Sequence, residues 1–161
     1  MIHFAGTKLD KSDMKLLRGA AKFTLNKFMT KNAQSKVFIT VRLDDDYGSK
    51  AYGDCYHMGV IDGVRHFQVT INTDKVNNRA KRPFVRLKAV IETIIHEMIH
   101  VKQYARGELF DYVNGGSRFQ GKKYKEALTL EDYYDSPYEI EAFGRTEGIF
   151  KMYIEHTRNN G

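Results

Sequence analysis

The most constraining feature of this 161-residue chain is an apolar run, Ile91 to Val101, that contains two histidines and two glutamates. Apolar residues recur through it at three- and four-residue steps, which predicts a helix over about 83–105. Pro83 suits the first turn of this helix and Gly107 its end. The helix is apolar around much of its circumference, so we expect it to be buried. Ionisable groups in such a helix are costly unless they are paired or bind a metal ion.

His96, Glu97 and His100 form the pattern HExxH within this helix. Residues four apart share one helix face, so both imidazoles can reach a single Zn²⁺ ion. Glu97 points to the side, where it can address a water molecule as general base. The single cysteine, Cys55, excludes a site built from several cysteines, so the other ligands must come from His, Asp or Glu.

A catalytic zinc site needs a third protein ligand and leaves one position open. Glu139 is the leading candidate, because it begins a predicted helix over about 136–156 in which Ala142, one turn later, permits close packing. Glu141 points about 200° away around that helix, so only one of the two can face the metal. Ser136 and Glu139 also fit a capping box, in which Glu139 would bind only backbone. Glu141 and other downstream carboxylates therefore remain alternatives.

The rest of the sequence predicts one α+β domain spanning residues 1–161. The expected elements are a helix over 12–31, strands over 36–43, 52–60 and 64–72, and an irregular loop or small hairpin over 108–135. Asp62-Gly63 between two apolar strands predicts a hairpin. We expect an antiparallel sheet of three or more strands, and a disordered tail over 157–161.

Three motifs resemble those of small zinc metallopeptidases of the zincin group, including SprT-like proteins and metallopeptidases encoded by bacteriophages. They are HEMIHVKQYARGEL (96–109), FQGKKY (119–124) and YYDSPYEIEAF (133–143). The E-x-x-A pattern at Glu139 and Ala142 resembles the third-ligand helix of gluzincins. Phe143 stands where that group often has an aspartate that supports a zinc histidine. SprT-like proteins often use a third histidine instead, and none is well placed here.

The resemblance implies a zincin-like fold and hydrolysis of a peptide or protein substrate at Zn²⁺, with His96, His100 and Glu139 as ligands and Glu97 as general base. It also implies that the substrate lies extended along an edge strand, for which we expect 66–72. A tyrosine often stabilises the oxyanion in this group, and the candidates are Tyr133, Tyr134 and Tyr138.

The chain has 26 Lys plus Arg against 20 Asp plus Glu, a net charge of +6. Its basic residues cluster at Lys75, Arg79, Lys81, Arg82, Arg86 and Lys88, and again at Lys122, Lys123 and Lys125. We favour solvation of these charges, with nucleic acid as an alternative partner. The alternative functions are therefore a DNA-associated SprT-like protease that acts on DNA-bound proteins, and a non-catalytic regulatory module stabilised by zinc.

The N-terminal residues lack the apolar core of a secretory signal. No window approaches the ~20 apolar residues that span a bilayer. We therefore expect a cytoplasmic protein without a membrane partner, located in the host-cell cytoplasm if it is viral.

Overall fold

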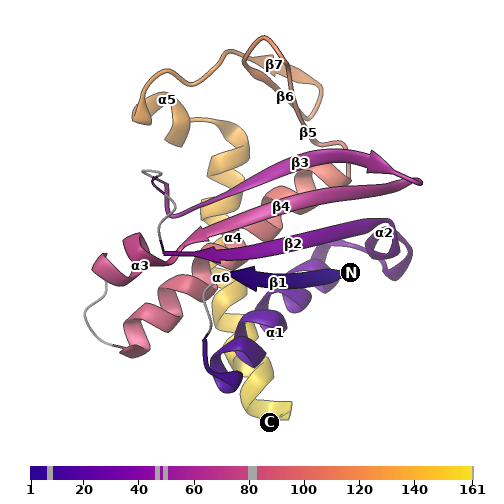
Figure 1. Cartoon of the computed structure of the whole chain (residues 1–161). Helices are drawn as coiled ribbons and strands as arrows, with labels where there is room; N and C mark the ends of the chain where they lie inside the picture. Colours follow the sequence, from indigo (N-terminus) through magenta and orange to yellow (C-terminus); the bar gives the residue numbers. More distant parts are fainter. Residues whose placement is uncertain (7–8, 46–47, 49–50, 80–82, 161) are drawn as a thin grey trace.

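A computed structural model describes residues 1–6, 9–45, 48, 51–79 and 83–160. The fold is mixed α+β, as predicted: a four-stranded sheet has its helices gathered on one face, and a smaller sheet lies beyond one edge (Figure 1). The helices are α1 (Lys11–Phe28), α2 (Lys31–Ser35), α3 (Thr73–Arg79), α4 (Pro83–Ala105), α5 (Leu130–Tyr134) and α6 (Pro137–Asn160). The strands are β1 (Ile2–Gly6), β2 (Val37–Asp44), β3 (Gly53–Ile61), β4 (Val64–Asn72), β5 (Leu109–Asp111), β6 (Ser117–Phe119) and β7 (Lys122–Tyr124).

The main sheet has the order β1-β2-β4-β3, and only β3 runs antiparallel to its neighbour. The expectation of an antiparallel sheet was therefore wrong. After β2 the chain continues to the edge of the sheet, where it forms β3. It then turns back as β4, which lies between β3 and β2 and pairs parallel with β2. The expected edge strand, 66–72, was also wrong, because β4 lies between two partners. The edge strand on that side is β3.

The β3–β4 hairpin forms as predicted. Asp62 and Gly63 both have positive φ angles, 50° and 76°, the conformation that a tight two-residue hairpin turn requires. Beyond the turn, the pairing is regular except for a shift between His57 and Gly59. This irregularity divides β3 into a segment next to the turn and a segment, Gly53 to His57, that runs beside α4.

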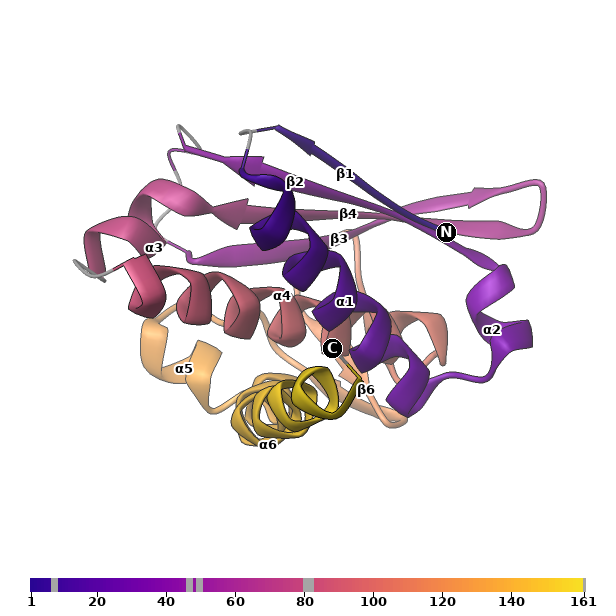
Figure 2. The ribbon, with the colours of Figure 1, turned by 90° about the horizontal axis from the view of Figure 1, so that it is seen from below.

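The core lies between the sheet and the helices beneath it. Figure 2 shows α1 and α4 directly under the strands, with α6 on the far side of α4. Alternate residues of β2, from Val37 to Leu43, are buried, as the two-residue period of a strand with one covered face requires. In α4, Ile94, Ile95 and every residue on to Gln103 are buried. The helix that carries HExxH is thus enclosed, as its composition predicts.

Two terminal segments differ from the sequence-based expectation. Residues 2–6 form β1, which pairs parallel with β2. The expected tail over 157–161 is helical up to Asn160, with Gly161 outside the described residues. The Tyr153 hydroxyl donates to the carbonyl of Leu16 at 2.8 Å, which fixes the second half of α6 against α1.

The connection over 108–135 contains more structure than the predicted loop or hairpin. β5, β6 and β7 form a small antiparallel sheet, and α5 follows. No helix in the described residues combines the length and the apolar character needed to cross a membrane.

Candidate metal centre

α4 places the two histidines of HExxH one turn apart and aims both rings toward α6. Both residues are buried, with 7% of His96 and 6% of His100 exposed. Their Nε2 atoms lie 3.1 Å apart. Two nitrogen atoms that can bind a metal ion therefore face each other at one point beside α4.

α6 brings a carboxylate to the same point. Glu139 Oε1 lies 3.2 Å from His100 Nε2, and Oε2 lies 3.2 Å from His96 Nε2. Glu139 is itself 3% exposed. His96, His100 and Glu139 thus form a buried group, with its ligand atoms all within 4.8 Å of one another, that could hold a metal ion.

The alternative carboxylate, Glu141, points elsewhere. It forms ion pairs with Lys102 at 2.8 Å and with Arg145 at 2.9 Å. The capping box expected from Ser136 and Glu139 does not form, since the Ser136 hydroxyl donates to the carbonyl of Asp132. The helical angle that separates Glu139 from Glu141 therefore sends the first to the histidines and the second to a lysine.

These atoms lie at separations near those of the ligands of a tetrahedral zinc ion, although the two Glu139 distances belong to different carboxylate oxygens. With Zn–N and Zn–O bonds of about 2.0–2.1 Å, ligand atoms of a tetrahedron lie about 3.3 Å apart. The observed separations are 3.1 and 3.2 Å. In addition, Glu139 Oε2 is buried without a hydrogen bond. Two imidazoles and one carboxylate are also the ligand set of known catalytic zinc sites.

The surroundings of this group lower the pKa of Glu139 and raise the pKa of His100. Burial opposes ionisation of Glu139, but His100 and His96 outweigh it and lower the pKa of Glu139 to about 2. Burial also opposes protonation of His100, but Glu139, Glu97 and Gln103 raise its pKa to about 9. Burial lowers the pKa of His96. In the metal-free protein Glu139 is therefore an anion paired with a protonated His100, and a bound cation would take the place of that proton.

Glu97 lies between α4 and the edge strand β3. A Cβ atom built on Gly53 would lie 2.8 Å from Glu97 Oε1, so the strand approaches this carboxyl group closely. Burial raises the pKa of Glu97 to about 8, and Glu139 and Asp54 add to the rise while His100 opposes it. A cation bound nearby would lower the pKa of Glu97 again.

Sequence reasoning missed the residue behind His100. Gln103 is fully buried, and its Oε1 lies 2.7 Å from His100 Nδ1. Its Nε2 donates to the carbonyl of Tyr138 and to Glu141, at 3.0 Å in each case. The available signal was an amide three residues after His100 in an apolar segment.

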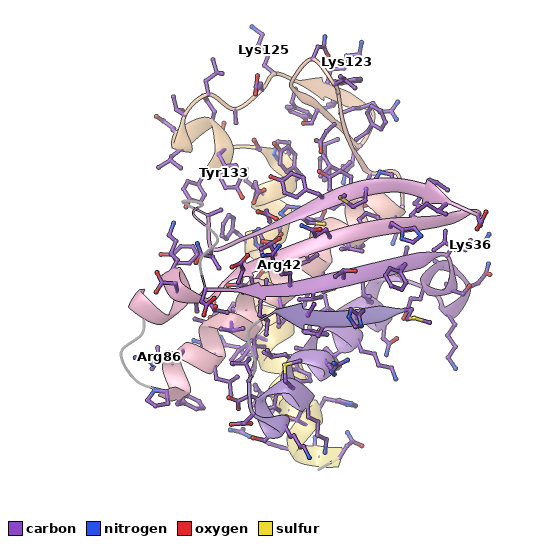
Figure 3. The ribbon with its side chains drawn as sticks, in the orientation of Figure 1. Lys36, Arg42, Arg86, Lys123, Lys125 and Tyr133 are labelled. Atoms are coloured by element: carbon purple, nitrogen blue, oxygen red, sulfur yellow. The ribbon has the colours of Figure 1, made fainter. Side chains whose placement is uncertain are left out.

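Of the three candidate tyrosines, Tyr133 interacts with Glu139 and is close enough to Glu97 to be affected by its charge. Burial and the charges of Glu139 and Glu97 raise the pKa of its phenol well above the usual value. Figure 3 shows Tyr133 between α5 and the main sheet. Tyr134 instead contacts Phe143, and Tyr138 lies between the rings of His100 and Phe119.

Phe143, which stands in place of the aspartate of gluzincins, packs on the metal-site histidine. Its ring centroid lies 4.4 Å from that of His96. No described residue forms a hydrogen bond with His96 Nδ1. Among the described residues, the ring of Phe143 thus contacts that of His96 without a hydrogen bond to Nδ1.

The basic clusters are described only in part. Lys122, Lys123 and Lys125 are exposed on and after β7. Figure 3 shows Lys123 and Lys125 at the top of the view. In the other cluster Lys88 pairs with Glu92 at 3.6 Å. The side chain of Arg79, together with Lys81 and Arg82, lies outside the described residues. The nucleic-acid hypothesis therefore stays a prediction.

Comparison of the chain with models of protein families gives no match, and no curated protein matches it either. The functional assignment therefore rests on the chemistry and geometry of these side chains.

Proposed function

We propose that this protein is a zinc-dependent metallopeptidase. The observation that carries the proposal is the buried group of His96, His100 and Glu139, with the carboxyl group of Glu97 next to it. These three residues would hold the ion. A zinc ion bound there supplies Lewis-acid chemistry, which acidifies water and polarises the scissile carbonyl group.

The chain's own groups provide the proton transfer. Glu97 is the general base that takes a proton from water and passes it to the leaving amine. Burial supports this role, because a carboxylate without solvation is a stronger base than an exposed one. Tyr133 is the best-placed phenol to donate a hydrogen bond to the oxyanion, since it lies near both Glu97 and Glu139.

The edge strand β3 supports a peptide substrate. Within the described residues β3 pairs only with β4, so its other edge has no strand partner and offers backbone groups with which an extended peptide could pair. The segment from Gly53 to His57 is regular and begins beside Glu97. A peptide paired there would run past the general base, whereas the shift after His57 would end the pairing.

The test compares wild type with Glu97→Gln on an unfolded protein or a peptide pool, with zinc content measured by mass spectrometry. We expect both proteins to hold zinc and only wild type to cleave, with a loss of at least about 10²-fold in the variant. Equal cleavage by the two would contradict the mechanism. If both hold zinc and neither cleaves, the non-catalytic zinc module becomes the better assignment.

A further inference from the structure

We propose that Gln103 is a positioning residue that keeps the proton of His100 on Nδ1 and so leaves Nε2 as the atom that binds a metal ion. Glu141 and Lys102 hold Gln103 in the orientation that this requires. The inference rests on the proposed metal site, but it concerns residues of which none is a ligand candidate in the arrangement observed.

The orientation of the Gln103 amide follows from its neighbours. One end of the amide lies 3.0 Å from two acceptors, the Tyr138 carbonyl and a Glu141 carboxylate oxygen. Only the NH₂ group can donate to both, because the reversed amide would place its oxygen against two other oxygens. The amide oxygen must therefore face His100, 2.7 Å from Nδ1.

An amide oxygen at that distance accepts a hydrogen bond and cannot donate one, so Nδ1 of His100 must carry the hydrogen. Whatever proton His100 carries on Nε2 is then the one that leaves when a metal ion binds. The other tautomer, with the proton on Nε2, would set two acceptors against each other at 2.7 Å. Gln103 thus selects the ring form that the site needs.

Glu141 is held in turn by ion pairs. Lys102, whose side chain is 6% exposed, lies 2.8 Å from Glu141 and 2.7 Å from Glu108. Removal of one partner would leave an unpaired charge at a buried position, which is strongly unfavourable. The series of contacts from Lys102 through Glu141 and Gln103 to His100 therefore has little freedom to rearrange. Glu141 thus has a structural role, the orientation of Gln103, although it does not face the metal.

The same support is missing at the other histidine. The ring of His96 contacts that of Phe143 at a centroid distance of 4.4 Å, and no described residue forms a hydrogen bond with its Nδ1 atom. Loss of the Gln103 amide should therefore affect which ring nitrogen of His100 carries the proton and leave the ring of His96 unaffected.

The decisive variant is Gln103→Leu, which keeps the approximate size of the side chain and removes its hydrogen bonds. We expect zinc affinity, measured by competition with a chromophoric chelator, to fall about 10- to 100-fold, the usual cost of removing a hydrogen bond behind a ligand histidine. Glu141→Ala, which frees one of the two anchors of Gln103, should cause a smaller fall. Arg145→Ala is the matched control, because half-exposed Arg145 pairs with Glu141 but does not contact Gln103, and it should bind zinc as wild type does.

A second measurement separates positioning from loss of structure. In NMR spectra that correlate imidazole protons with ¹⁵N, wild type should show a slowly exchanging Nδ1–H proton on His100. Gln103→Leu should lose this signal. Unchanged zinc affinity in Gln103→Leu, or an Nδ1 atom without a proton in wild type, would overturn the proposal. If wild type binds no zinc at all, the proposed function fails, while the His100 signal still tests the role of Gln103.

Discussion

At the residue scale, two glutamates lie close to the same histidines, and their surroundings shift the pKa values of the two carboxyl groups in opposite directions. Glu139 lies directly between the imidazoles, which lower its pKa to about 2. Glu97 faces a strand and two other acids, and burial raises its pKa to about 8. Carboxyl groups whose pKa values are separated in this way commonly take different chemical roles, which supports our proposal that Glu139 binds the metal ion and Glu97 accepts the proton.

The raised pKa of Glu97 predicts that the free energy of unfolding of the metal-free protein depends on pH. The folded pKa of about 8 exceeds the unfolded value of 4.5, so the native state binds more protons between these values. Stability contributed by the neutral carboxyl is therefore full below about pH 4.5 and is lost as the pH rises toward 8. Relative to Glu97→Gln, metal-free wild type should lose about 1 kcal/mol of unfolding free energy per pH unit across this window. Urea unfolding in excess chelator at about pH 5 and about pH 8 measures it, and parallel pH slopes for the two proteins would refute the prediction.

The side chains that sequence analysis identified were those fixed by local geometry. HExxH follows from helix periodicity, and the angle of about 200° between Glu139 and Glu141 permits only one of them to face the two histidines. The roles of Gln103 and Tyr133 were not predictable, because each depends on contacts between elements distant in the chain. The Ser136 capping box failed for the same reason: the histidines offer Glu139 stronger partners than a backbone amide does.

At the element scale, the site depends on the close approach of β3 to α4. Gly53 lacks the Cβ atom that would meet Glu97 Oε1 and Thr93 Cγ2, each at 2.8 Å, and the carbonyl of Thr70 at 3.1 Å. The absence of a side chain there lets the carboxyl of Glu97 sit between helix and strand.

Gly53→Ala should therefore displace Glu97 while leaving His96, His100 and Glu139 in place. We expect peptide cleavage to fall about 10²-fold, as a displacement of about 1 Å can cause, with zinc content unchanged. Gly144→Ala on α6 is the control, because a Cβ atom added there would meet nothing within 4 Å and the helix favours alanine. Simultaneous loss of zinc in Gly53→Ala would show that the strand supports the ligands as well.

Local signals were enough to locate most elements. α4 begins and ends where Pro83 and Gly107 predict, and the three strands that were expected lie within one residue of their observed bounds. The order of the sheet was not predictable, because a parallel pairing such as β1 with β2 joins segments separated by a whole helix. The short β5, β6 and β7 carry too few residues for a periodic pattern.

At the scale of the whole molecule, a metal ion would link two helices that come from separate parts of the chain. His96 and His100 lie on α4 under the sheet, and Glu139 lies in the first turn of α6 on the far side of α4 (Figure 2). An ion bound only by the native state stabilises it by mass action.

Zinc should therefore raise the unfolding temperature. At a free concentration of about 1,000 times Kd the expected gain is about 4 kcal/mol, which corresponds to about 10 °C for a chain of this size. Glu139→Ala should show no such rise in a thermal scan, whereas Glu141→Ala should retain a smaller one. A rise that survives in Glu139→Ala but disappears in Glu141→Ala would transfer the ligand role to Glu141.

The separation in sequence between His100 and Glu139 also means that the ribosome adds the two histidines well before the carboxylate. A ribosome that adds about 5–20 residues per second needs about two to eight seconds to extend the chain from His100 to Glu139. Through that interval the nascent polypeptide carries both histidines and Glu97 but lacks the carboxylate that would complete the group. The order of translation thus delays completion of this group until Glu139 has been added to the chain.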